Sequence, residues 1–355
     1  MSQARNHHYV PACYLKHFAV PQDRYEGRLH VYDRITGRPF PSSPDKSARE
    51  KNFYRVEVDG EDPNLGENAY EALETRFAPT LARLIARGTF PTDETERAEV
   101  FAFVASQAVR TPRIRETQLR FYNDAAMLFM HTLADNKDVF MKKLRDAEPG
   151  ISDEDAEEMY ATHLEFLNAK GARVVMDQTT LVRNSLELAG EIADVLALRH
   201  WILGRPSDDD AKFVTTDDPV HLQPAADPRR MHPLWSPGFG DANTNVLVPL
   251  SPRLLLIGLP YPHDRARIRL PRRVVAEVNG SLAYAAHRFV YCNEPSFEFV
   301  DDANAIVIGP NDALAWRGDG TSMAERMGSS RALGHRAADD RQHAPLRPNR
   351  RPSGS

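Results

Sequence analysis

Two adjacent histidines near the start of the chain are the residues best suited to acid–base chemistry. His7 and His8 precede the segment Tyr9-Val10-Pro11. In an extended backbone, neighbouring side chains point to opposite faces, so one histidine can face a site while the other packs or forms a hydrogen bond. We therefore predict that His7 or His8 is catalytic. The alternative is an exposed histidine pair with no particular role.

Three glutamates at helical spacing form a second candidate group. Glu67, Glu71 and Glu74 lie about 100° around a predicted helix from its apolar stripe, at the border of the buried face. Partial burial raises the pKa of a carboxylate, and a neighbouring cation restores its charge, so such a border can hold a metal or a general base. Glu71 and Glu74 are therefore candidate metal ligands. The alternative is an ordinary solvated helix flank.

An arginine at a predicted helix end could bind an anion. Arg110 follows Gln107 by one helical turn, where the apolar pattern makes an unpaired charge costly. A guanidinium can bind a carboxylate or phosphate through two parallel hydrogen bonds, so we predict a catalytic role for Arg110 and substrate-binding roles for Gln107 and Arg113. The alternative, favoured for Arg113 and Arg115, is a structural tether. A glutamate of the preceding helix is the natural partner of Arg110.

A threonine and an aspartate at a predicted strand end complete the candidate site. Thr216 and Asp217 precede Asp218-Pro219, a sequence that favours an exit from an extended strand into a turn. Asp217 is a candidate catalytic residue and metal ligand, and Thr216 is a candidate substrate-binding residue. Arg34, which follows an early predicted strand, is a further candidate for substrate binding. The alternative for Asp217 is a turn in which its carboxylate caps the local backbone.

The elements that must position these residues predict an α+β fold, in which a central helical block is flanked by N- and C-terminal strands that form a mixed sheet. Early strands are expected around Leu29 and at 53–58. The predicted helices cover 65–84, which Pro79 should kink or split, 93–111, 119–133, 152–167 and 180–203. Later strands are expected at 213–216, 245–249, 254–259, 289–292 and 305–308, and a long surface loop at 221–243.

The chain divides into four predicted parts. Residues 1–64 form an N-terminal strand and turn segment with the histidine pair, 65–203 the helical block, and 204–317 a strand-rich part. Residues 318–355 are rich in Arg, Pro and Gly and are expected to be disordered.

The composition is that of an average globular protein. The 355 residues are 41% hydrophobic and 27% charged, which excludes a fibrous, collagen-like or wholly disordered chain, and the net charge of −5 shows no global basic field. Two cysteines cannot form a disulfide framework and fit a reducing compartment. No secretory segment is recognised, and no apolar run approaches the ~20 residues of a membrane helix. We expect a cytoplasmic protein that does not enter a membrane.

Several segments together resemble the family called domain of unknown function 4238. The resemblance rests on His7-His8-Tyr9-Val10-Pro11 followed by Tyr14-Leu15 and Phe18, on Asp33-Arg34, on Arg110-Thr111-Pro112, on residues 213–220 and on Pro249-Leu250-Ser251-Pro252, all in the same order. The chain departs from the family pattern at Asp218, where Asn is commoner, and at Lys16-His17. The resemblance covers roughly residues 5 to 310 and implies a shared fold without naming a reaction.

The leading hypothesis is a metal-dependent hydrolase, specifically a nuclease acting on phosphodiesters. The candidate cofactor is a divalent metal, Mg, Mn or Zn, with four candidate ligands: His8, Glu71, Glu74 and Asp217. Nucleic acid or another anionic substrate is the candidate partner. No nucleotide or redox cofactor is expected, because the P-loop and dinucleotide-binding motifs do not occur. Two alternatives stay open: a non-catalytic binding or regulatory protein with a buried polar network, and a metal-free small-molecule enzyme with a histidine general base.

Overall fold

Strands from both ends of the chain pair in one sheet, which confirms the predicted α+β fold. The computed structural model describes residues 6–22, 25–60, 62–169, 171–225, 237–301, 303–311 and 314. The sheet that joins the two ends has the order β2 (Val20–Gln22), β3 (Tyr25–Asp33), β12 (Phe289–Cys292) and β7 (Thr215–Thr216), with β4 (Arg38–Ser42) on β3. No helix in the described part of the chain is long and apolar enough to span a membrane.

A second sheet is mixed and comes entirely from the later part of the chain. Its order is β11 (Arg267–Leu270), β6 (His200–Pro206), β10 (Leu254–Leu259), β9 (Thr244–Ser251) and β8 (His221–Pro224). Only the β11–β6 pair is parallel among its neighbours. Two small pairs complete the strands: β1 (Asn6–His8) with β5 (Arg49–Lys51), and β13 (Phe297–Val300) with β14 (Ile306–Gly309).

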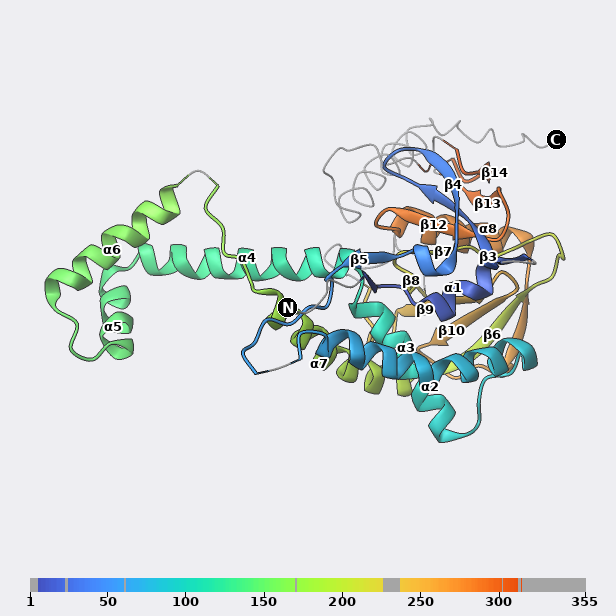
Figure 1. Ribbon diagram of the computed structural model, residues 1–355, viewed down its shortest axis with the longest axis horizontal. Coiled ribbons are helices and arrows are strands. Elements are labelled where there is room, and N and C mark those ends of the chain that lie inside the picture. Colours follow the sequence, from blue (N-terminus) through green and yellow to red (C-terminus); the bar gives the residue numbers. More distant parts are fainter. Residues whose placement is uncertain are drawn as a thin grey trace, which may run out of the picture.

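The helices form a layer on the body and an arm that projects from it (Figure 1). The layer contains α2 (Leu65–Arg87), α3 (Glu94–Val109) and α7 (Gln178–Ala197), and the arm contains α4 (Pro112–Ala134), α5 (Lys137–Ala147) and α6 (Asp153–Asn168). The short α1 (Ala12–Leu15) and α8 (Arg272–Ala285) belong to the body. Thr111 caps α4, where its side chain accepts a hydrogen bond from Ile114 N, and proline occupies the first position of the helix, where it loses no hydrogen bond.

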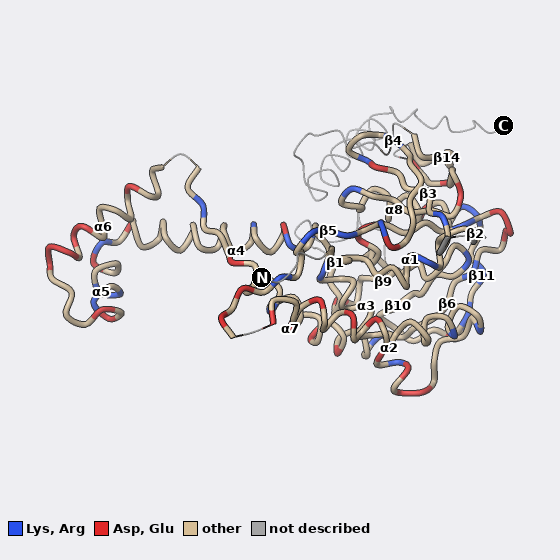
Figure 2. The backbone as a smooth tube through the Cα atoms, viewed as in Figure 1, with Lys and Arg blue, Asp and Glu red and all other residues tan. Residues whose placement is uncertain are grey.

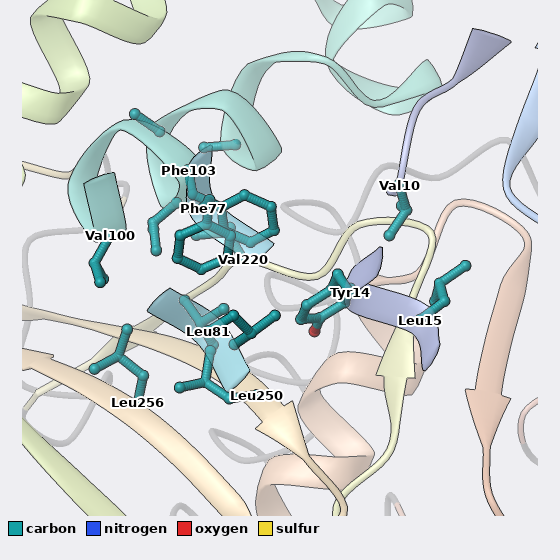
Figure 3. Packing of buried hydrophobic residues seen from close by; sticks show 14 of the residues in the cluster. Val10, Tyr14, Leu15, Phe77, Leu81, Val100, Phe103, Val220, Leu250 and Leu256 are labelled. Atoms are coloured by element: carbon teal, nitrogen blue, oxygen red, sulfur yellow. The ribbon is translucent and has the colours of Figure 1, made fainter. Parts of the chain in front are cut away.

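The hydrophobic core anchors the N-terminal segment to the helix layer (Figure 3). Tyr14 is fully buried, and its hydroxyl donates to the main-chain oxygen of Pro249 at 2.5 Å. Its ring lies 6.0 Å from that of Phe103, which stacks on Phe77 at 3.7 Å. The segment that follows the histidine pair is therefore held between α2, α3 and β9.

Several predicted elements differ from the structure, among them the strand at 213–216, of which only Thr215–Thr216 forms β7. Residues 53–58 are not a strand, because the backbone of this region is satisfied by side chains: Gln178 Nε2 donates to the main-chain oxygens of Asn52 and Arg55. Proline does not split α2, since Pro79 is exposed and the hydrogen bond that it removes lies on a solvated face. The predicted helix at 180–203 ends at Ala197, because pairing of β6 with β10 overrides the helical pattern.

The predicted loop at 221–243 begins with strand β8, which pairs with β9. Residues 226–236 of that loop and the predicted tail at 318–355 lie outside the described residues. The four-part division of the chain stays a prediction.

Candidate functional site

The two histidines occupy opposite faces of β1, as the extended backbone predicts. His7 is 1% exposed, its Nδ1 accepts a hydrogen bond from Tyr54 N at 2.8 Å, and its ring stacks on Tyr54. His8 is half-buried, and its Nε2 lies 3.1 Å from the main-chain oxygen of Asp45. Because a carbonyl oxygen can only accept, Nε2 carries the proton in neutral His8, and Nδ1 keeps the lone pair.

Burial lowers the pKa of His8 below its ordinary value of 6.5. The contact with Asp45 and the charge of Glu74 act in the opposite direction, while the cations of Arg49 and Arg110 lower the pKa further. His8 is therefore a neutral imidazole near pH 7. It is accessible to solvent and lies within the field of one carboxylate and two guanidinium groups.

Arg110 is enclosed at the end of α3 and positions a carboxylate of α2. Its side chain has no exposed surface, and Nη1 is 2.9 Å from Glu74 Oε1. With the Gln107 amide oriented to satisfy its neighbours, the Gln107 oxygen accepts from Arg110 Nη2 at 2.8 Å and Nε at 2.9 Å. The guanidinium also lies over the ring of Tyr70 at 4.9 Å. Arg110 thus has the predicted glutamate partner, but its donors are directed at protein groups.

Glu74 is only partly buried, since its side chain is 23% exposed. Cys13 also lies in this cluster, and burial together with the negative charge of Glu74 raises the pKa of its thiol to about 11. The thiol is therefore protonated near pH 7 and is a poor nucleophile. The acid–base groups of the cluster are His8 and Glu74.

Arg49 is a site residue that sequence reasoning missed. In the antiparallel β1–β5 pair it lies directly opposite His8, and residues in that relation project on the same face. Arg49 is exposed, and its positive charge is close enough to His8 to lower the pKa of the imidazole. No local motif identifies Arg49, because the pairing joins segments about forty residues apart.

Asp217 belongs to a second polar cluster, where it fixes the backbone before β12. It is 1% exposed, and its carboxylate accepts hydrogen bonds from the main-chain nitrogens of His287, Arg288 and Phe289 at 2.7–2.9 Å. Burial raises the pKa of Asp217 to about 6, and the neighbouring charge of Asp218 acts in the same direction. The predicted local cap is thus replaced by a long-range one.

The remaining candidates in this region also have structural partners. Thr216 is fully buried, and its hydroxyl donates to the main-chain oxygen of Asp218 at 2.8 Å. Arg113 contacts Asp218 at 3.0 Å and donates to the main-chain oxygen of Ala285. Arg34 donates to three main-chain oxygens, those of Leu314, Tyr284 and Ala286. These contacts make Arg34 and Arg113 tethers between segments distant in sequence.

The four predicted metal ligands do not converge on one point. Glu71 is exposed on α2, and Asp217 is directed at the backbone before β12. Among the described residues, no group of three or more His, Cys, Asp or Glu side chains is placed to hold a metal ion. The structure brings together only His8 and Glu74 of that set, together with Gln107 and Arg110.

The comparisons with known proteins place the chain in a family without indicating a reaction. The family model described as "Protein of unknown function (DUF4238)" matches residues 6–296, which is more than half of the chain. Neither the comparison with curated proteins nor that with solved structures found a significant match. The matched range contains the histidine pair, Arg49, Glu74 and Arg110. The chain therefore belongs to the DUF4238 family of proteins of unknown function.

Proposed function

We propose that this protein is a hydrolase for a small substrate that carries a phosphate or carboxylate group. The observation that carries the proposal is the placement of His8 opposite Arg49, next to a Glu74 carboxylate that a buried arginine holds in position. His8 would be the general base, and Arg49 would bind the anionic group of the substrate. This proposal develops the second alternative of the sequence analysis, a metal-free small-molecule enzyme with a histidine general base.

The chemistry of His8 supports a role as general base. Its Nε2 proton is directed at the carbonyl of Asp45, which leaves the Nδ1 lone pair for a water molecule. Water activated in this way attacks the phosphorus or carbonyl carbon of an ester, and His8 takes the proton that the water loses. The bond from that atom to the ester oxygen breaks, the oxygen leaves with the electron pair, and protonated His8 or solvent returns a proton to it. Protonated His8 is then stabilised by the nearby negative charge of Glu74, which itself raises the pKa of the imidazole.

Arg49 and Arg110 have different roles in this proposal. The exposed Arg49 can form two hydrogen bonds with a phosphate or carboxylate, whereas Arg110 is committed to Glu74 and Gln107. Arg110 is therefore a positioning residue. A substrate without negative charge gains nothing from Arg49, so the proposal predicts a preference for anionic substrates.

The substitution His8→Gln tests the proposal. We expect wild type to give a larger rate enhancement over the uncatalysed reaction with p-nitrophenyl phosphate or bis-p-nitrophenyl phosphate than with neutral p-nitrophenyl acetate. His8→Gln should lower kcat/KM for the better of the two phosphate esters by about 10²–10⁴-fold. In wild type, kcat/KM should rise with pH, with a midpoint below the ordinary histidine pKa of 6.5, because burial lowers the pKa of His8 and the neutral imidazole is the active form. Release of p-nitrophenol measures each rate.

His263→Gln is the matched control, because His263 is exposed in a loop of the strand-rich part. It should leave the rate unchanged. Each assay is run with EDTA and with added Mn²⁺. Absence of hydrolysis of both phosphate esters, a larger rate enhancement with the neutral acetate, or equal rates for wild type and His8→Gln would refute the proposal. A rate that requires Mn²⁺ would refute the metal-free mechanism and favour the metal-dependent nuclease instead.

A further inference from the structure

The helix that forms the shaft of the arm exposes an unusually apolar surface. None of the 23 residues of α4, all of which the structure describes, is buried. Phe121 is 67% exposed, Leu128 70% and Phe129 53%. Figure 2 shows the charged residues of α4 near its body end, and Ala125–Ala134 contains no Asp, Glu, Lys or Arg. Large exposed apolar side chains grouped in this way mark an interaction surface.

Two of these side chains, Phe121 and Leu128, lie along one face of the helix, whereas the ring of Phe129 has the ammonium group of Lys143 of α5 over it at 5.9 Å. Phe121, Ala125 and Leu128 follow the spacing i, i+4, i+7, which places them in one stripe with Ile114 and Thr132. The opposite face of α4 is used within the chain: Asn123 Oδ1 accepts a hydrogen bond from Val174 N at 3.0 Å. The stripe is therefore the outward face of a helix about 35 Å long, and a long partner surface can reach it.

We propose that this face of α4 packs antiparallel against the same face of a second copy of the chain. The charges beside the stripe support a self-complementary contact. Arg120 and Asp124 are both exposed and one helical turn apart, on the same side of the stripe. In an isologous antiparallel pair, Arg120 of each copy can face Asp124 of the other, so one cation and one anion in each copy form two ion pairs between the copies.

The shape of the molecule and the helix dipoles agree with this occupant. The arm projects from the body (Figure 1), and Phe121, Ala125 and Leu128 of the stripe are all exposed. Antiparallel packing sets the two helix macrodipoles in opposite directions, which is favourable. In the register that brings Arg120 of one copy to Asp124 of the other, the small Ala125 in the centre of the stripe lies close to the larger Phe121 of the other copy, and the two can pack together.

Sedimentation velocity of the full chain over a range of concentrations tests the proposal. We expect a monomer–dimer equilibrium in wild type, and a dimer dissociation constant at least about tenfold higher for Leu128→Glu. Arg120→Glu and Asp124→Arg should each weaken the dimer. Combined in one chain, the two charge reversals should restore it, because the ion pairs are then reversed rather than lost.

Leu198→Glu is the matched control, since Leu198 is 86% exposed after α7 and lies off the arm. It should leave the dimer unchanged. Thermal unfolding of each variant verifies that it is folded. Wild type that stays monomeric at every concentration would overturn the proposal and leave the stripe to a different partner. A dimer that Leu128→Glu leaves intact, or charge reversals that the combined variant does not rescue, would overturn it as well.

Discussion

Replacing Arg110 with methionine is expected to lower the free energy of unfolding by about 3–5 kcal/mol. The arginine side chain has no exposed surface and forms contacts with Glu74 and Gln107. Methionine fills part of the same volume, but it leaves the partly buried carboxylate of Glu74 without its cation and the Gln107 oxygen without its donors. Urea unfolding, followed by tryptophan fluorescence, gives the difference between the two proteins.

A surface ion pair of the same helix layer is the control for this substitution. Arg83 of α2 contacts Glu96 of α3 at 2.8 Å, but its side chain is 41% exposed. Exposed pairs contribute about 0.2–1 kcal/mol, so Arg83→Met should have a small effect. The double substitution Arg110→Met with Glu74→Leu should recover part of the loss, because it removes the isolated carboxylate. A loss for Arg110→Met no larger than that for Arg83→Met would contradict the assigned network.

The Arg110 network also shows which part of the site a sequence can predict. The end of α3 and the apolar stripe of α2 are local patterns, and together they place a glutamate beside an arginine that burial would otherwise make costly. The opposite orientations of His7 and His8 follow from the alternation of an extended strand. These predictions need only neighbours in sequence and one helix–helix contact.

The rest of the site depends on contacts between segments that are distant in sequence, and no local pattern predicts them. Arg49 faces His8 only because β1 pairs with β5 in one register, and a shift by one residue would turn it to the other face. Asp217 accepts from the backbone about seventy residues further along the chain, where sequence reasoning had a local turn as the alternative. Residues 53–58 have the pattern of a strand, but side chains replace a neighbouring strand as hydrogen-bond partners of their backbone. Nδ1 of His7 accepts from Tyr54 N, and Nε2 of Gln178 donates to the main-chain oxygen of Arg55.

Asp217→Ala is expected to lower the free energy of unfolding by about 3 kcal/mol or more. The substitution leaves three main-chain N–H groups, those of residues 287–289, without their acceptor, and the carboxylate they bind is buried. These groups lie at the start of β12, which holds β3 and β7 together. Asp217→Ala therefore destabilises the sheet that joins the two ends of the chain.

The pH dependence of this loss follows from the pKa of Asp217. Burial raises it from an ordinary value of 3.8 to about 6, so the folded protein favours the protonated carboxyl. The stability that this preference contributes is fully present below the ordinary pKa and is lost as the pH rises through about 6. The difference between wild type and Asp217→Ala should therefore be larger at about pH 4 than at about pH 7.

Asp177 provides the control for both expectations. Its carboxylate also accepts a hydrogen bond from a main-chain nitrogen, that of Thr180 at 2.9 Å, but Asp177 is exposed at the start of α7. Hydrogen bonds from the main chain and the hydroxyl of Thr180 lower the pKa of Asp177. Asp177→Ala removes only a helix cap and should cost about 0.5–2 kcal/mol. Because its pKa is lowered, its contribution is present above the ordinary pKa and is lost as the pH falls, so the two variants should respond to pH in opposite directions. If the stability losses of both variants decreased as the pH falls from about 7 to about 4, Asp217 would be ionised in the folded protein throughout this range, and the raised pKa would be wrong.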